Sequence, residues 1–238
     1  EVQLTWMDAK VGDWVVTPRR GKPVEVNALW ANALRIAASL GKEFGDSAGA
    51  EKFHDMASRA EESFAAKFWN AEKNCLYDVL GPERPDASIR PNQVFAISLP
   101  FPLLDEEKRK AVMRVVEEKL LTPVGLRSLA PEDPKYKGRY EGSLDDRDAA
   151  YHQGTAWPWL LGPFVTAWLN AFGRTPENLD HCRKMIAPME ARMHVFGLGT
   201  INEIYDGDAP QYPHGCVAQA WSVAELLRVI QKELQGKI

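Results

Sequence analysis

Hydrophobic residues recur at the spacing of an α-helix along most of this chain. Side chains three and four positions apart share one face of a helix, so this pattern predicts amphipathic helices. The pattern predicts about seven helices, over Val24–Leu40, Ser47–Trp69, Pro91–Leu99, Asp105–Leu121, Ala156–Phe172, Thr175–Val195 and Cys216–Leu234. Strand signals are few, and Cys75–Leu80 is the best short candidate. The sequence therefore predicts an all-α fold.

Local signals set several helix ends. Asp105 and Thr175 have short polar side chains that can cap the helices that follow them, and Pro176 suits a first helical position. Gly41 is predicted to end the first helix, because glycine favours the position just past a helix.

Charge separates the predicted helices into two kinds. Ser47–Trp69 and Asp105–Leu121 are charged on one side, as expected of outer helices. Val24–Leu40, Ala156–Phe172 and Cys216–Leu234 carry few charges, so we expect them to be buried on most sides. Alternation of the two kinds predicts two concentric layers of helices, an α/α toroid. A plain helical bundle is the alternative.

Three long loops are rich in aromatic, glycine and charged residues. They span Leu4–Pro23, Leu121–Thr155 and Phe196–Gly215, and each precedes one of the low-charge helices. Long loops in a compact domain are uncommon and are often functional. We therefore expect the three loops to meet at one end of the helical layer and to form a shared site there.

Composition and charge exclude several classes of partner. The chain is 45% hydrophobic and 26% charged with a net charge of −4, and no basic run stands out, so nucleic acid is not an expected partner. The stretch Ala149–Gly173 lacks formal charge and is long enough to cross a bilayer. It contains residues that lipid would penalise, such as His152 and Asn170, so we interpret it as a buried helix and expect no membrane contact.

The cysteines and histidines are scattered. Cys75, Cys182 and Cys216 form an odd, widely spaced set, which predicts buried free thiols in a reducing cytoplasm. The five histidines form no ligand pattern, so neither a metal nor another cofactor is expected. The chain begins with Glu1 rather than Met, and we expect it to be a piece of a longer protein.

Carboxylates lie among aromatic residues in all three loops. Aromatic faces can stack on sugar rings, and two carboxylates on opposite sides of a glycosidic bond supply the acid and the base of its hydrolysis. The residues concerned are Trp6, Asp8, Asp13 and Trp14 in the first loop, Tyr140, Glu141, Asp145, Asp146, Asp148 and Tyr151 in the second, and Glu203, Tyr205, Asp206, Asp208 and Tyr212 in the third.

Several longer motifs, in the same order, resemble the C-terminal catalytic domain of glycogen debranching enzymes. They run from Leu4 to about Arg228 and comprise Leu4–Lys10 (LTWMDAK), Thr17–Trp30 (TPRRGKPVEVNALW), Ser88–Gln93 (SIRPNQ), Gly125–Ala130 (GLRSLA), Tyr151–Trp159 (YHQGTAWPW), Asn202–Gly207 (NEIYDG) and Gln219–Ala224 (QAWSVA).

The resemblance implies a glucoamylase-like (α/α)6 toroid of the six-hairpin glycosidases, with amylo-α-1,6-glucosidase activity and an inverting mechanism. By motif, Asp8 corresponds to the general acid, and Glu203 corresponds to the general base, ahead of the nearby Asp206 and Asp208. The expected substrate is a glycogen-like glucan. The residues expected to line its glucose subsite are Trp6, Arg19, Glu25, His152, Gln153 and Trp157.

The helix count departs from a whole toroid. Six hairpins need more helices than the roughly seven predicted here, so residues 1–238 are expected to be the C-terminal part of the catalytic domain. A missing half would leave apolar helix faces uncovered, which predicts self-association. Two other functions stay open. One is another toroid glycosidase, such as a trehalase or an α-1,4-glucosidase, and the other is a glycan-binding or assembly fragment without activity.

Overall fold

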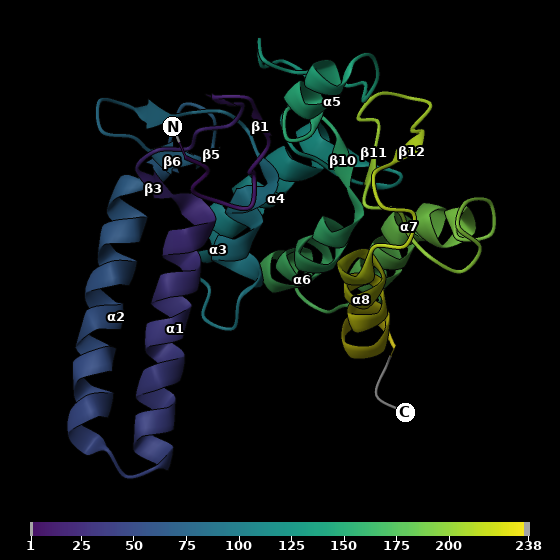
Figure 1. Ribbon diagram of the computed structural model, residues 1–238. Helices are drawn as coiled ribbons and strands as arrows, with labels where there is room; N and C mark the ends of the chain where they lie inside the picture. Colours follow the sequence, from purple (N-terminus) through teal and green to yellow (C-terminus); the bar gives the residue numbers. More distant parts are fainter. Residues whose placement is uncertain (1, 236–238) are drawn as a thin grey trace.

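The computed structural model describes residues 2–235. Helices dominate this part of the chain (Figure 1), and the α-helices are α1 (Val24–Glu43), α2 (Ser47–Lys67), α3 (Phe95–Ser98), α4 (Glu106–Leu120), α5 (Leu144–Ala150), α6 (Leu161–Phe172), α7 (Pro176–Arg192) and α8 (Ala220–Val229). Short 3-10 helices at Pro91–Val94 and Pro158–Leu160 precede α3 and α6, and a π-helix at Ile230–Leu234 continues α8.

The strands are all two or three residues long. They are β1 (Lys10–Val11), β2 (Trp14–Val15), β3 (Lys22–Pro23), β4 (Trp69–Asn70), β5 (Cys75–Leu76), β6 (Val79–Leu80), β7 (Pro85–Asp86), β8 (Leu121–Thr122), β9 (Gly125–Arg127), β10 (Ala156–Trp157), β11 (Ile204–Tyr205) and β12 (Pro213–His214). They pair antiparallel into four small sheets, of which the largest has the order β12-β11-β10-β9-β8.

The helices form two layers, as the charge pattern predicted. A row of contacting helices runs through α1, α3, α6 and α8. Outside this row, α2 packs on α1, while α4 and α7 pack on α6. Figure 1 shows α6 in the middle, the α1–α2 hairpin at one side and α8 at the other. Helix α6 is buried almost throughout, which explains why its sequence carries no charge.

Two helix ends confirm the local signals, and one does not. Asp105 Oδ1 accepts a hydrogen bond from Lys108 N at 2.9 Å, and the hydroxyl of Thr175 caps α7. Gly41, in contrast, lies inside α1, which ends at Glu43. A Cβ at Gly41 would lie 3.1 Å from Ala50 Cβ of α2, so this glycine serves the close approach of the two helices rather than a helix end.

Several predicted segments have other bounds or another structure in the protein. Ala156–Trp157 is strand β10, so α6 begins only at Leu161, and residues 216–219 precede α8 without being helical. The strand candidate Cys75–Leu80 divides into β5 and β6, which belong to different sheets. Helix α5 lies inside a predicted loop, where a capping box of Ser143 and Asp146 starts it.

Burial differs from the prediction on two helices. Val24–Leu40 and Cys216–Leu234 were expected to be buried on most sides, yet both carry large apolar side chains that are 40% or more exposed. These side chains are Val26, Leu29, Trp30, Ile36 and Leu40 on α1, and Val217, Trp221 and Leu227 on or next to α8. Both helices stand at the ends of the contacting row, where no further described helix covers them.

The cysteines are free in the described chain, but only two of them are buried. Burial raises the pKa of the Cys75 thiol to about 11 and that of the Cys182 thiol to about 12. Cys216 was also expected to be buried and is exposed instead, because it precedes α8 in a surface turn.

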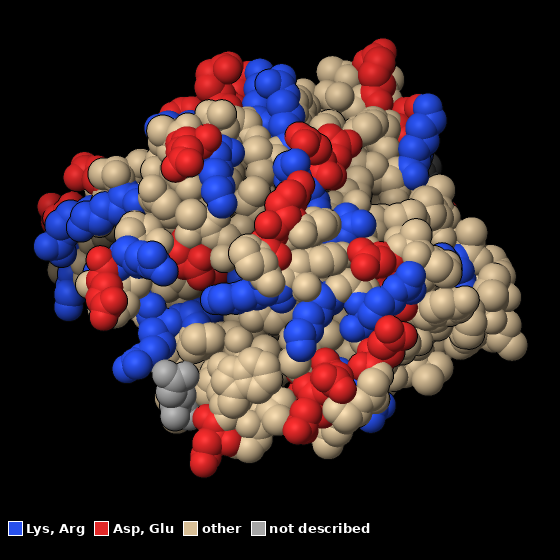
Figure 2. Space-filling model, turned by 90° about the horizontal axis from the view of Figure 1, so that it is seen from above, with Lys and Arg blue, Asp and Glu red and all other residues tan. Residues whose placement is uncertain are grey.

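All three long loops meet at one end of the helical layer, as predicted. Strands β8 to β12 join the second and third loops to Trp157. The first loop is fixed to the second by hydrogen bonds from Ala9 N to His152 Nδ1 and from Gln153 Nε2 to Val16 O. On the face seen from above, basic and acidic side chains are interspersed (Figure 2). Among the helices of residues 2–235, none is long and apolar enough to cross a membrane.

Candidate active site

A pocket of about 490 Å³ opens where the three loops meet. This volume is within the range of small-molecule sites. The residues that line it are Trp6, Asp8, Tyr151, His152, Trp157, Glu203, Gln219 and Trp221. The pocket therefore contains both predicted catalytic carboxylates, Asp8 and Glu203, together with three of the six side chains predicted to bind glucose.

Packed aromatic rings form one side of the pocket. The Trp6 ring meets His152, Trp157 and Trp159 edge-on, at centroid distances of 5.3, 5.2 and 5.2 Å. His152 stacks on Trp157 at 5.1 Å with an angle of 8° between the rings. Trp159 in turn stacks on Trp221 at 5.0 Å. Rings held in this way keep a fixed apolar surface, against which a sugar ring can pack.

Asp8 lies at the exposed rim of the pocket. Its neighbour Met7 is fully buried, and the backbone N–H of Ala9 donates to His152 Nδ1 at 3.4 Å. The indole N–H of Trp6 donates to Asn92 Oδ1 at 2.8 Å. The residues on both sides of Asp8 are therefore anchored, while its carboxylate stays open to solvent.

Glu203 is half-buried, and the start of α8 orients its carboxylate. Oε2 accepts from Cys216 N at 3.2 Å, and Oε1 accepts from Gln219 Nε2 at 3.0 Å. A Cβ at Gly215 would lie 2.4 Å from Glu203 Oε2, and Gly215 has a φ of +69°, so glycine is needed at this turn. Glu203 is thus held in one orientation beside a turn that favours glycine.

Tyr151 lines the pocket together with both carboxylates. Burial raises the pKa of its hydroxyl, a hydrogen bond to Glu203 raises that pKa further, and the negative charge of Asp8 adds to the effect. Tyr151 therefore stays protonated at neutral pH and can donate to Glu203.

Asp206 and Asp208, the alternatives for the base, join the third loop to the second. Asp206 is buried, and its carboxylate accepts from Tyr140 N at 2.8 Å, His214 Nε2 at 3.0 Å and Arg139 at 3.1 Å. Asp208 Oδ1 accepts from the Tyr136 hydroxyl at 2.8 Å. Neither carboxylate lines the pocket. Both carboxylates therefore connect the third loop to the second.

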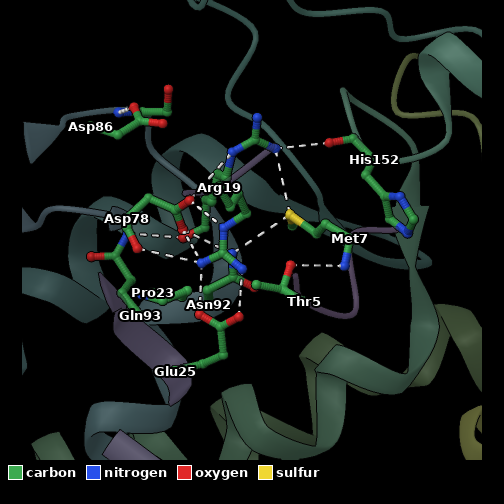
Figure 3. A network of polar contacts seen from close by, with 12 residues as sticks. Thr5, Met7, Arg19, Pro23, Glu25, Asp78, Asp86, Asn92, Gln93 and His152 are labelled. Atoms are coloured by element: carbon green, nitrogen blue, oxygen red, sulfur yellow. Dashed lines mark hydrogen bonds and ion pairs between the residues drawn. The ribbon is translucent and has the colours of Figure 1, made fainter. Parts of the chain in front are cut away.

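Arg19 and Glu25 lie behind the pocket, in a buried polar cluster (Figure 3). Arg19 forms two parallel hydrogen bonds to Glu25, one of them 2.6 Å long, and Arg19 Nε donates to Asp78 Oδ2 at 2.7 Å. Although burial alone would lower the pKa of Arg19, Asp78 and Glu25 together raise it. Asn92 Nδ2 donates to Asp78 Oδ1 at 2.8 Å, so the cluster reaches the pocket through Asn92 and Trp6.

Arg90 extends this cluster to the second loop. It donates to the backbone oxygen of His152 at 2.8 Å and to Gln153 Oε1 at 2.7 Å. Gln153 was predicted to contact glucose. Its side chain instead forms hydrogen bonds to Arg90 and to the backbone oxygen of Val16, and it does not line the pocket. Burial, together with the nearby Arg90 and Arg19, lowers the pKa of His152 to about 3.

His152 is consequently neutral at physiological pH. Because its Nδ1 accepts the N–H of Ala9, the single ring proton lies on Nε2. His152 can therefore offer one fixed donor to a hydroxyl group.

Tyr151, Gln219 and Trp221 line the pocket but were not assigned a catalytic or glucose-binding role from the sequence, which noted Tyr151 only among the loop aromatics. All three occur in the motifs Tyr151–Trp159 and Gln219–Ala224, so the segments were identified while the individual roles were not. Within residues 2–235, no group of three or more His, Cys, Asp or Glu side chains is arranged to hold a metal ion.

Comparisons with known proteins agree with the motifs. The family described as Amylo-alpha-1,6-glucosidase matches residues 1–228. The glycogen debranching enzyme of Saccharomyces cerevisiae is 28% identical over 221 residues, which cover 76% of this chain and 14% of that protein. The present chain thus spans about one-seventh of this relative.

Solved structures show the fold. The mannosylglycerate hydrolase of Thermus thermophilus in complex with glucose superposes with a TM-score of 0.66 at 17% identity, over 88% of this chain and 48% of that one. Neutral trehalase from Saccharomyces cerevisiae gives a TM-score of 0.64 at 16% identity, over 88% of this chain and 37% of that one. Both are (α/α)6 toroid glycosidases, and the present helices correspond to less than half of such a chain.

Proposed function

This chain belongs to the amylo-alpha-1,6-glucosidase family, and on that premise we propose that it hydrolyses α-1,6-linked glucosyl branch points of glycogen-like glucans with inversion. The observation that carries the proposal is the pairing of Asp8 and Glu203. They come from loops almost 200 positions apart and line one aromatic pocket, which Tyr151 also lines.

In the proposed reaction, Asp8 donates a proton to the glycosidic oxygen as the bond from this oxygen to the anomeric carbon breaks. Glu203 takes a proton from a water molecule, whose oxygen forms the new bond at the opposite face of the sugar. An inverting enzyme needs room for that water, so its two carboxyl groups lie about 6.5–9.5 Å apart. The open rim at Asp8 suits a departing glucan, and the oriented Glu203 suits activation of water.

The glucose subsite would use the aromatic wall. Trp6 is half-buried and offers an apolar face, and His152 Nε2 offers a fixed hydrogen-bond donor. Trp157 is only 2% exposed and its ring is stacked by His152, so it would support this wall from behind. Arg19, Glu25 and Gln153 would act by positioning this wall, through Asn92 and Arg90, rather than by contacting sugar. Three free thiols suit the reducing cytoplasm that the cysteine pattern predicts.

The test is glucose release from a branched limit dextrin, compared with release from maltose and trehalose. Both the full-length protein and this chain alone should be assayed, with the anomer of the first product determined by NMR. We expect the full-length protein to release β-glucose from the dextrin and to leave maltose and trehalose largely intact. Preferred cleavage of either disaccharide would favour the other toroid glycosidases. Binding of dextrin without any release by the full-length protein would favour a non-catalytic module.

A further inference from the structure

A second cavity, of about 410 Å³, lies beside the first and is not part of it. One wall is the β1–β2 hairpin and the residues after it, and the other is formed by the second loop before α5, by α5 itself and by Gln153 after it. The residues that line it are Trp14, Val15, Val16, Pro18, Lys135, Lys137, Ala149 and Gln153. We call this cavity the hairpin groove.

Gln153 joins the two walls of the hairpin groove. Its Nε2 donates to Val16 O at 3.2 Å, and its backbone oxygen accepts from Lys137 N at 2.6 Å. Helix α5 packs against β1 as well. The two walls of the groove are therefore fixed to each other. His152, which precedes Gln153 in the sequence, lines the first pocket.

Trp14 is exposed on one wall of the groove. Its side chain is 52% exposed, although Trp usually buries most of its large ring. Lys135 and Lys137 are exposed on the other wall and can donate hydrogen bonds to neutral oxygen acceptors. An open indole face beside flexible donors is the combination that binds a sugar ring, which has an apolar face and a rim of hydroxyl groups.

The position of the groove relative to Asp8 indicates which part of the substrate the groove would bind. An acid that protonates the glycosidic oxygen lies on the side where the leaving group departs. The hairpin starts at Lys10, two residues after Asp8, and its two ends are joined by a hydrogen bond from Val16 N to Ala9 O. A glucan leaving at Asp8 would therefore pass towards the hairpin.

We infer that the hairpin groove binds the glucan chain that carries the branch, with Trp14 stacking on one of its glucose rings. This inference rests on the proposed function, because it assigns the side of the leaving group from Asp8. It separates two tasks, with the terminal glucose held in the first pocket and the polymer held in the hairpin groove.

The test compares a polymeric and a small substrate in the full-length protein. In Trp14→Ala we expect KM for a branched limit dextrin to rise on the order of tenfold, the change that follows when one ring loses the apolar contact of a sugar face. The kcat should stay unchanged, and so should hydrolysis of α-glucosyl fluoride, whose leaving group never reaches the groove. Trp14→Tyr should restore most of the affinity. Phe44→Ala, which removes an exposed ring at the far turn of the α1–α2 hairpin, is the matched control.

Three outcomes would overturn the inference. One is an unchanged KM for the dextrin in Trp14→Ala, and another is an equal rise in Phe44→Ala. The third is a parallel loss with α-glucosyl fluoride, which would show that Trp14 acts by positioning Asp8. If the wild-type protein hydrolyses no glucoside, the proposed function fails by itself. Retardation in native gels that contain glycogen then tests the groove directly, and it should be lost in Trp14→Ala alone.

Discussion

At the scale of single residues, the two carboxylates of the pocket are held in different ways. Glu203 is oriented by two donors that belong to the start of α8 and the turn before it. Asp8 is positioned through its backbone neighbours Trp6, Met7 and Ala9, while its carboxylate is exposed. The roles proposed for Asp8 and Glu203 make different demands, since the proposed acid would follow a departing oxygen and the proposed base would hold one water. These two settings suit them.

Asp8→Asn and Glu203→Gln should each reduce glucose release by about 10²–10⁴-fold, because each removes one partner of the proton transfers. The two variants should differ with α-glucosyl fluoride in the full-length protein. Fluoride leaves with little protonation, so this substrate should largely rescue Asp8→Asn. It should not rescue Glu203→Gln, in which water still lacks its base.

Asp208→Asn is the control for this pair, because its amide oxygen can still accept from Tyr136. It should retain near-normal turnover. If Glu203→Gln keeps full turnover while an Asp206 or Asp208 variant loses it, the base is Asp206 or Asp208 and not Glu203. Full activity in all of these variants would place the acid and the base elsewhere.

His152 should make the stability of this chain depend on pH. Its pKa is about 3 in the folded chain and 6.5 as the ordinary value. Between these values the unfolded chain binds a proton that the folded chain does not, so stability falls as pH falls below 6.5. The slope is about 1.4 kcal/mol per pH unit. Urea unfolding of His152→Gln should lack this part of the slope, whereas replacing the exposed His194 by Gln should leave it. Equal slopes in wild type and His152→Gln would contradict a neutral, buried His152.

At the scale of elements, the sequence predicts best those features that depend on residues close together in the chain. The caps of α4 and α7 involve residues three positions apart, so Asp105 and Thr175 could be identified. The prediction that Gly41 ends the first helix was wrong, because the role of this glycine depends on Ala50 of the partner helix. Strand β10 could not be foreseen, since its two residues are defined by β9 and β11, which lie about 30 and 50 positions away.

The same limit applies to the site. Motifs identified the segments that carry Asp8, His152, Trp157 and Glu203, and the fold brings these together. Arg19 and Glu25 lie in an equally clear motif, yet their partner Asp78 lies outside every motif quoted. Whether a charged side chain faces a ligand or another side chain depends on such distant partners.

The buried cluster links the first loop, α1 and the turn between β5 and β6. Arg19 has a φ of +29°, unusual for a residue other than glycine, so its partners compensate backbone strain as well as charge. Arg19→Met leaves Glu25 without its partner and should cost about 3–5 kcal/mol in the free energy of urea unfolding. The double variant Arg19→Met/Glu25→Met should cost less than the two single costs together, because no unpaired charge remains at that pair. Normal stability with lost glucan affinity would instead show that Arg19 contacts the substrate.

At the scale of the whole molecule, the row of helices α1, α3, α6 and α8 has two uncovered ends. The present helices correspond to 48% and 37% of the two toroid glycosidases compared. In a closed ring each inner helix has neighbours on both sides, and here α1 and α8 have a described neighbour on one side only. The three long loops lie at the upper end of the row in Figure 1. The exposed stripe of α1 contributes no residue to the pocket, whereas Trp221 of α8 lines the pocket and is also 40% exposed.

The uncovered face of α1 is the larger one, and it is organised as a stripe. Val26, Leu29, Trp30, Ile36 and Leu40 recur at helical spacing and are each 44–53% exposed. An apolar stripe of this kind marks a surface that associates. We therefore expect this chain on its own to self-associate through α1, with a fraction of oligomer that rises with protein concentration in sedimentation velocity experiments.

Charged substitutions test whether the self-association occurs through the α1 stripe or is non-specific. Leu29→Lys and Ile36→Lys each place a charge in the middle of the stripe, where burial against a second copy would cost the desolvation of an ammonium group. Both variants should shift the chain to monomer without lowering its stability, because both side chains are solvent-exposed in the single chain. Ala66→Lys adds the same charge to the exposed side of α2 and should leave the association unchanged. A wild-type chain that stays monomeric at every concentration would contradict the prediction, and oligomers that persist in both stripe variants would assign the contact to another surface.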